Sequence, residues 1–171
     1  MRVAIDIGCW PGGFDSISYL IDELKVDKLI GFDPHPETPI YKGKKIKGAK
    51  VWTYRSAAHT RDGFIGWRQS GWGSYTTREE NAPQVPMADI ASFIKKLIEK
   101  GEDSGNEVEW LAVKLDVEGD EFPILRHLIE TGVIHVIDML WVEWHGNDPA
   151  RKELSKWIET HTDCELHEWT L

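Results

Sequence analysis

Ionisable side chains gather where two apolar segments of the sequence end, at residues 110–117 and 133–144. Side chains alternate along a strand, so residues two positions apart point to the same side. If the two segments are neighbouring strands, three carboxylates, a lysine and a histidine meet at one edge of a sheet. Burying so many ionisable groups is costly unless they pair with one another or bind a ligand. The residues are Lys114, Asp116 and Glu118 from the first segment and Glu143 and His145 from the second.

This group of residues offers two ways to remove the proton of a reacting hydroxyl group. His145 is the member whose ordinary pKa lies near neutrality, which favours it as a general base. Alternatively, the carboxylates of Asp116, Glu118 and Glu143 bind Mg²⁺, which would acidify a hydroxyl bound to it. A structural ion network, for instance with Lys114 paired to Glu143, is the interpretation without a catalytic role. We predict that His145 is the base and that Glu143 and Glu118 complete the catalytic group.

A glycine-rich turn follows the first apolar run, in the segment DIGCWPGGF at residues 6–14. Its glycines are spaced GxxxGG, whereas dinucleotide sites favour GxGxxG. Asp6 precedes the first glycine and would repel a pyrophosphate, but it favours a cationic ligand such as the sulfonium and amino groups of S-adenosylmethionine. The alternative is a tight strand-to-helix turn with a solvated Asp6.

A second acid, Asp33, ends the next apolar run 27 residues after Asp6. Nucleotide-binding folds place an acid at a comparable distance, where it accepts hydrogen bonds from the ribose hydroxyls. A carboxylate there disfavours a ligand with a 2′-phosphate. The alternative is that Asp33 only caps the turn at Pro34.

The positions of the apolar residues predict strands that alternate with helices along the whole chain. Apolar rather than alternating strands predict a sheet that is covered on both faces. We therefore expect an α/β fold with a mainly parallel central sheet, the strand 3–7 in its middle, and a single compact domain over residues 1–171. The expected strands are 3–7, 28–32, 51–54, 64–67, 110–117, 133–144 and 164–169. The expected helices are 14–24, 88–100 with Gly101 as C-cap, 122–131 and 150–160. Residues 37–50 are expected to form a loop or short hairpin, and a loop is expected to begin at 71–74.

Composition narrows the classes of partner and compartment. The net charge of −9 and the pI of about 5.2 argue against a dedicated nucleic-acid-binding protein. We interpret the lysines at 42–50 as a solvated loop, and the alternative is a contact with a phosphate, a nucleotide sugar or nucleic acid. Two cysteines without a CxxC pair indicate neither a disulfide framework nor a zinc site. The apolar run at the N-terminus is too short for a signal peptide or a membrane span. These features predict a cytoplasmic protein without a membrane partner.

Several motifs together resemble the FkbM-type methyltransferases. They are DIGCWPGGF, IGFDPHP, GWGS, VPMADI, VKLDVEGDEFPIL and WVEWH, in that order over residues 3 to about 146. Members of this family use S-adenosylmethionine, have a Rossmann-like class I methyltransferase fold and mostly methylate hydroxyl oxygens. The resemblance implies that S-adenosylmethionine is bound by Asp6, Gly8, Cys9, Gly12, Phe14, Asp33, Ser56, Ala57 and Asp116.

The resemblance predicts an S-adenosylmethionine-dependent enzyme that methylates a hydroxyl of a small polar or sugar-like acceptor. The carboxylates described above make Mg²⁺ a second candidate cofactor. Two other functions stay open. A module that binds S-adenosylmethionine without turnover would have the same cofactor residues. A nicotinamide-dependent oxidoreductase is disfavoured by Asp6 and by the glycine spacing.

Overall fold

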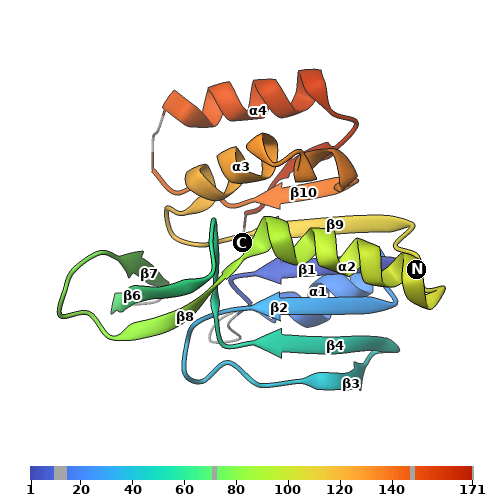
Figure 1. The fold of residues 1–171 in the computed structure, drawn as a ribbon, viewed down its shortest axis with the longest axis horizontal. Helices are drawn as coiled ribbons and strands as arrows, with labels where there is room; N and C mark the ends of the chain where they lie inside the picture. The colour runs from blue at the N-terminus through green and yellow to red at the C-terminus, as the bar shows by residue number, and fades with distance from the viewer. Residues whose placement is uncertain (10–14, 71–72, 147–148, 171) are drawn as a thin grey trace.

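The main sheet has β1 (Arg2–Ile7) as its middle strand. The computed structural model describes residues 1–9, 15–70, 73–146 and 149–170. Within them the strand order is β11-β10-β9-β1-β2-β4-β3, and neighbouring strands are parallel except for the β3–β4 pair (Figure 1). The mainly parallel sheet with the strand 3–7 in its middle is therefore confirmed. The other strands are β2 (Lys28–Phe32), β3 (Lys42–Ile46), β4 (Ala49–Tyr54), β9 (Trp110–Leu115), β10 (Met139–Val142) and β11 (Glu165–Glu168).

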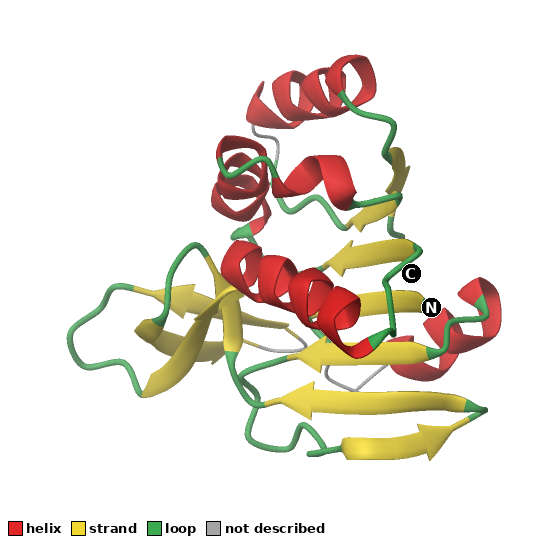
Figure 2. Ribbon diagram, turned by 45° about the vertical axis from the view of Figure 1, so that its right-hand side comes forward, coloured by secondary structure: helices red, strands yellow, loops and turns green. Residues whose placement is uncertain are grey.

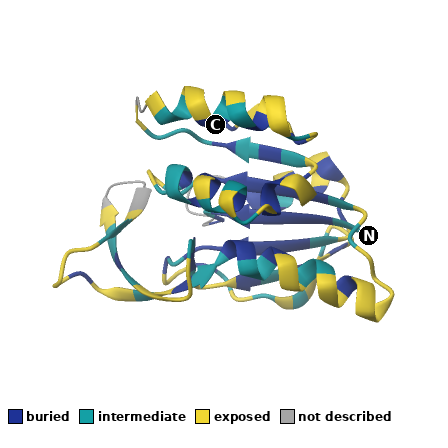
Figure 3. Ribbon diagram, turned by 45° about the horizontal axis from the view of Figure 1, so that its top comes forward, coloured by how far each residue is buried: buried dark blue, intermediate teal, exposed yellow. Residues whose placement is uncertain are grey.

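Helices cover both faces of this sheet, which explains why its central strands are apolar throughout. Val3 and Ile5 belong to the hydrophobic cluster on one face, and Ala4 belongs to the cluster on the other face. Figure 2 shows helices on both sides of the sheet, and Figure 3 shows the buried strands between helices whose outer faces are exposed. One face is covered by α1 (Ser16–Leu24), and the other by α2 (Ile90–Ser104), α3 (Glu121–Glu130) and α4 (Pro149–His161).

A second, smaller sheet lies beyond the carboxyl ends of the main strands (Figure 1). Its strand order is β5-β8-β6-β7. The sequence indicated only the strand 64–67 of this sheet, because most of the remaining residues are polar, exposed or both and give no apolar run. The strands are β5 (Ala57–His59), β6 (Gly63–Ser70), β7 (Gly73–Thr77) and β8 (Gln84–Asp89).

The predicted strand 133–144 is wrong in its first half. A short 3-10 helix, η1 (Val133–Val136), follows Gly132, and β10 begins only at Met139. Val133 and Ile134 are buried against α3, so their apolar character serves the core and not the sheet. A continuous apolar run does not distinguish these two environments.

The predicted C-cap at Gly101 is also wrong, because α2 continues to Ser104 and Gly105 caps it with a φ of 68°. Gly101 lies inside the helix, where a Cβ would come within 2.9 Å of the carbonyl oxygen of Asn106. Glycine is therefore favoured at position 101 because the chain passes close to the helix at Asn106, and not because the helix ends there.

The lysine-rich segment 37–50 contains a hairpin, one of the two alternatives given for it. β3 and β4 pair antiparallel, and Lys47 and Gly48 have positive φ at the turn.

Among the described helices, none is long and apolar enough to cross a membrane.

Candidate functional site

The carboxyl ends of β1 and β9 hold a buried ion pair. Asp6 and Lys114 lie opposite each other on these neighbouring strands, and their side chains are 0% and 1% exposed. Lys114 Nζ lies 3.2 Å from Asp6 Oδ1 and 3.2 Å from Asp116 Oδ2, and it donates a hydrogen bond to the carbonyl oxygen of Gly8 at 2.9 Å. Ser16 Oγ donates a hydrogen bond to Asp6 Oδ2 at 2.6 Å. The solvated Asp6 of the alternative interpretation is therefore excluded.

The charges of Asp6, Lys114 and Asp116 do not balance one another. Burial raises the pKa of Asp6, and the charge of Lys114 and the hydrogen bond from Ser16 counter that rise. Burial on its own would lower the pKa of Lys114, but the charges of Asp6 and Asp116 outweigh it and raise the pKa above its usual value. The distance of 3.2 Å between Lys114 Nζ and Asp6 Oδ1 is that of an ion pair. Two carboxylates then share one ammonium group, which leaves an excess of negative charge where β1 ends.

Gly8 is required by its surroundings at the end of β1. Its φ is +85°, and a Cβ at this position would lie 1.9 Å from the carbonyl oxygen of Asp116. Its amide donates a hydrogen bond to the carbonyl oxygen of Phe32 at 2.9 Å. The turn therefore brings the backbones of three strand ends into close approach, and only glycine fits.

His145 lies among three carboxylates at the ends of β9 and β10. Its Nδ1 is 2.7 Å from Glu121 Oε1, and its Nε2 is 3.4 Å from Glu118 Oε2 and 3.8 Å from Glu143 Oε1. Glu121 is 0% exposed and also accepts hydrogen bonds from the amides of Val117 and Gly119. Glu121 thus fixes both the loop after β9 and the imidazole ring.

The pKa of His145 in the fold differs from its ordinary value near neutrality. The hydrogen bond to Glu121 and the surrounding negative charges raise the pKa of His145 to about 9, against the effect of burial. The ring is therefore protonated at neutral pH and has no lone pair available to accept a proton. Burial and the charge of Asp116 raise the pKa of Glu143, which makes this carboxylate a second candidate base.

The structure differs from two further expectations about the charged residues at the ends of β9 and β10. Lys114 pairs with Asp6 and Asp116 rather than with Glu143. The extended backbone ends at Leu115, and Glu118 has a φ of 52°, so this carboxylate reaches His145 through a turn and not by strand alternation. A left-handed backbone at a residue other than glycine is strained and is often found at functional sites.

We expect His145 to titrate near pH 9 in an NMR titration and the Glu121→Gln variant to titrate clearly closer to the ordinary histidine value. Since the folded-state pKa is raised from 6.5, the interaction stabilises the fold below about pH 6.5 and is lost as the pH rises through about 9. The stability difference between wild type and variant should therefore shrink over that range. Glu153→Gln, which removes an exposed carboxylate 3.9 Å from Arg126, is the control and should leave the titration unchanged. An unchanged titration in Glu121→Gln would contradict this account.

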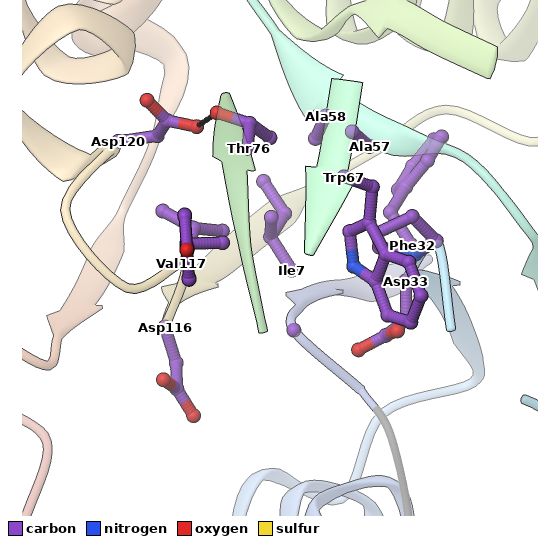
Figure 4. Close-up of a pocket in the computed structure, with 13 residues that line it drawn as sticks. Ile7, Phe32, Asp33, Ala57, Ala58, Trp67, Thr76, Asp116, Val117 and Asp120 are labelled. Carbon is purple, nitrogen blue, oxygen red and sulfur yellow. Dashed lines mark hydrogen bonds between the residues drawn. The ribbon is translucent and has the colours of Figure 1, made fainter. Parts of the chain in front are cut away.

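A pocket opens between the main sheet and the second sheet, with an empty volume of about 390 Å³ that includes space open to solvent. Figure 4 shows Ile7 and Val117 at its centre, Ala57 and Ala58 on one side, and Trp67 beside Asp33 and Phe32. Its remaining walls include Gly8, Pro34, Tyr75, Thr76, Asp116 and Asp120.

The second sheet supplies the part of the pocket that sequence reasoning missed. Trp67 belongs to β6, and Tyr75 and Thr76 belong to β7. Thr76 Oγ1 donates a hydrogen bond to Asp120, which immediately precedes α3, so the hairpin is tied to the main sheet (Figure 4). The sequence indicated the strand 64–67, which contains Trp67, but it predicted a loop from the glycine-bounded GWGS segment where β7 begins.

Asp33 lines the pocket and also caps its own turn. The residue is 5% exposed, and its Oδ1 accepts hydrogen bonds from the amide of His35 at 2.7 Å and from Thr38 Oγ1 at 3.3 Å. The structure thus confirms that Asp33 caps the turn, and the residue also lines the pocket.

The remaining predicted cofactor residues differ in their positions relative to the pocket. Ala57 and Asp116 line the pocket with Gly8, whereas Asp6 lies behind it in the ion pair. Cys9 is 1% exposed and packs in the core against Gly31, and the Ser56 hydroxyl donates to the carbonyl oxygen of Pro86. Gly12 and Phe14 lie outside the described residues.

A metal ion has a different candidate ligand set from the one predicted. Ligand atoms of Asp116, Glu118 and His145 lie within 4.8 Å of one another, so the histidine takes the place predicted for Glu143. One imidazole and two carboxylates suit a divalent cation. A proton on His145 and a metal ion at its Nε2 exclude each other.

Comparison of the chain with protein-family models, with curated proteins and with solved structures finds no match. Any function assigned to the chain therefore rests on the site itself.

Proposed function

We propose that this chain binds S-adenosylmethionine at the carboxyl edge of the main sheet and transfers its methyl group to a hydroxyl oxygen of a small polar or sugar-like acceptor. The observation that carries the proposal is the excess negative charge of Asp6 and Asp116 beside the close-approach glycine Gly8. A sulfonium and an amino group are attracted to such a site, whereas a pyrophosphate is repelled. The strand order outward from β1 supports a Rossmann-like methyltransferase fold, in which ligands bind at this edge.

The pocket residues fit the adenosine part of the same cofactor. Ile7, Phe32 and Ala58 give apolar walls, and Asp33 offers a carboxylate. The indole Nε1 of Trp67 is buried and has no hydrogen-bond partner among the described residues. A buried donor without a partner is costly, so a ligand acceptor at this position would stabilise the site.

The cofactor supplies an electrophilic methyl group, and the protein must orient the acceptor and accept its proton. We assign the proton to Glu143, whose pKa is raised by burial and by Asp116. His145 lies 3.8 Å from Glu143 and is protonated, so it is a positioning residue that holds the carboxylate in place. Glu118 and Glu121 in turn hold the imidazolium.

Calorimetry with S-adenosylmethionine, S-adenosylhomocysteine and NAD tests the proposal without knowledge of the acceptor. The two sulfur compounds should bind and NAD should not. NAD binding alone would overturn the proposal and favour an oxidoreductase. Binding of S-adenosylmethionine with no transfer to any acceptor would favour a module without turnover.

Asp33→Asn is expected to weaken S-adenosylmethionine binding by about 1–3 kcal/mol, the range for hydrogen bonds to a charged group. The amide oxygen of the introduced asparagine can still accept from His35 and Thr38, so the turn and the unfolding midpoint should be preserved, unlike in Asp33→Ala. Asp22→Asn removes an exposed carboxylate that pairs with Lys47 and serves as the matched control in the same calorimetry. Unchanged affinity in Asp33→Asn would move the ribose contact elsewhere.

A further inference from the structure

A second pocket lies on the face of the main sheet between α2 and β4, separate from the carboxyl-end site. Its empty volume is about 580 Å³, which includes open solvent. Figure 1 shows α2 in front of the sheet, with β4 and β3 below the helix in this view. We call this pocket the lysine groove; it is lined by Lys28, Ile30, Trp52, Tyr54, Phe93, Lys96, Leu97 and Lys100.

Strand and helix periodicity place the groove residues on one surface. On β4, Lys50, Trp52 and Tyr54 alternate with the buried residues of the opposite face. On α2, Phe93, Leu97 and Lys100 are three and four residues apart and therefore share a helix face, with Lys96 at its edge. The groove is thus built from two regular elements and not from a loop.

The strand register adds further lysines to the same face. Lys28 pairs with Lys50 across β2 and β4, and Lys45 pairs with Lys50 across β3 and β4. Lys42 is opposite Trp52. Residues directly opposite each other point to the same side of a sheet, and like charges in such positions destabilise it. Folding alone therefore does not account for this arrangement.

Among the described residues, no carboxylate lines the lysine groove. Within the part of the chain that the structure describes, Lys28, Lys50, Lys96 and Lys100 form no salt bridge within 4.0 Å. Burial and the charge of Lys50 lower the pKa of Lys28, as expected for a cation without a compensating anion. The local charge is positive although the whole chain carries −9.

The groove also presents aromatic surface. Tyr54 is 43% exposed and stacks on Phe32 with a centroid distance of 5.1 Å. Phe93 meets Tyr54 edge-on at 6.0 Å, and Lys28 Nζ lies 5.0 Å from the ring centroid of Trp52. A planar ring placed on Tyr54 would therefore have ammonium groups within reach along the groove.

We propose that the lysine groove binds a nucleoside monophosphate, with the base against Tyr54 and the phosphate among the lysines. Aromatic rings stack with bases of any sequence, and ammonium groups pair with phosphate as point charges. The net charge of −9 opposes the approach of a long polyanion, which favours a mononucleotide over a nucleic-acid strand. This site is independent of the proposed methyltransferase function.

The experiment is calorimetry of the full chain with AMP, adenosine and inorganic phosphate, in the presence and absence of S-adenosylhomocysteine. AMP should bind better than either fragment, more weakly as salt is raised, and equally well with S-adenosylhomocysteine present. Lys96→Glu reverses a charge in the groove and should weaken AMP binding about tenfold or more, the effect of losing one charge-assisted hydrogen bond. Lys95→Glu makes the same change one residue away, at an exposed position outside the groove, and should alter binding less than about twofold.

Three results would overturn the proposal. The first is no AMP binding at millimolar concentration. The second is AMP binding that Lys96→Glu leaves unchanged and Asp33→Asn abolishes, since the nucleotide would then occupy the carboxyl-end pocket. The third is binding of a ten-nucleotide single strand without binding of AMP, which would identify a nucleic-acid surface instead.

Discussion

Lys114→Met is expected to lower the free energy of unfolding by about 3–5 kcal/mol, the cost of removing one partner from a buried ion pair. The variant leaves the Asp6 carboxylate fully buried and takes away the ammonium group that it shares with Asp116. Methionine fills a similar volume, so a loss of packing contributes little. The measurement is urea unfolding at pH 7.

The matched control is Lys47→Met, because Lys47 pairs with Asp22 at the surface, with both side chains about half exposed. Its effect should stay within about 1 kcal/mol. Adding Asp6→Asn to Lys114→Met should recover part of the lost stability, since the amide carries no charge. A loss below about 1 kcal/mol in Lys114→Met would show that the pair does not support the fold.

The pH dependence gives a second test of the same ion pair. Without Lys114, burial raises the pKa of Asp6 in the folded state further above its unfolded value. A raised carboxyl pKa destabilises the fold while the group is charged, and the penalty is relieved as the pH falls through the folded-state pKa. The difference between wild type and Lys114→Met should therefore be largest near neutral pH and smaller in acid.

Glu143→Gln is expected to lower the turnover of the proposed methyl transfer by about 10²- to 10⁴-fold, the usual contribution of a general base. The amide is nearly isosteric but cannot accept the proton. S-adenosylmethionine affinity should change little, because the variant acts on proton transfer. Turnover is measured with an acceptor found by screening sugars and polyols with methyl-labelled S-adenosylmethionine.

The pH profile distinguishes the two candidate bases. If Glu143 accepts the proton, activity rises with pH through a carboxyl pKa that is raised above its usual value. If His145 accepts it, activity rises only near its pKa of about 9. Full activity in Glu143→Gln together with loss of activity in EDTA would instead assign the carboxylates to a metal ion. Glu130→Gln makes the same change at the far end of α3 from Glu121 and is the control variant for the activity measurements.

The sequence by itself determined the central sheet and where its chemistry lies. The apolar runs at β1, β2 and β9 are buried on both faces, and this is the condition under which a strand is continuously apolar. The acids at the ends of these runs then had to meet, because parallel strands place their carboxyl ends at one edge. The grouping of Lys114, Asp116, Glu118, Glu143 and His145 was predictable for this reason.

Tertiary structure alone decided the partners and protonation of those groups. Lys114 pairs with Asp6 because β1 and not β10 places a buried carboxylate opposite it. His145 is protonated because Glu121, from the start of α3, lies 2.7 Å from its ring. The second sheet likewise depends on pairing between mostly polar segments, and the lysine groove depends on the register of β2, β3 and β4. Distances of a few ångströms between residues far apart in the chain set these energies, and only the folded chain contains them.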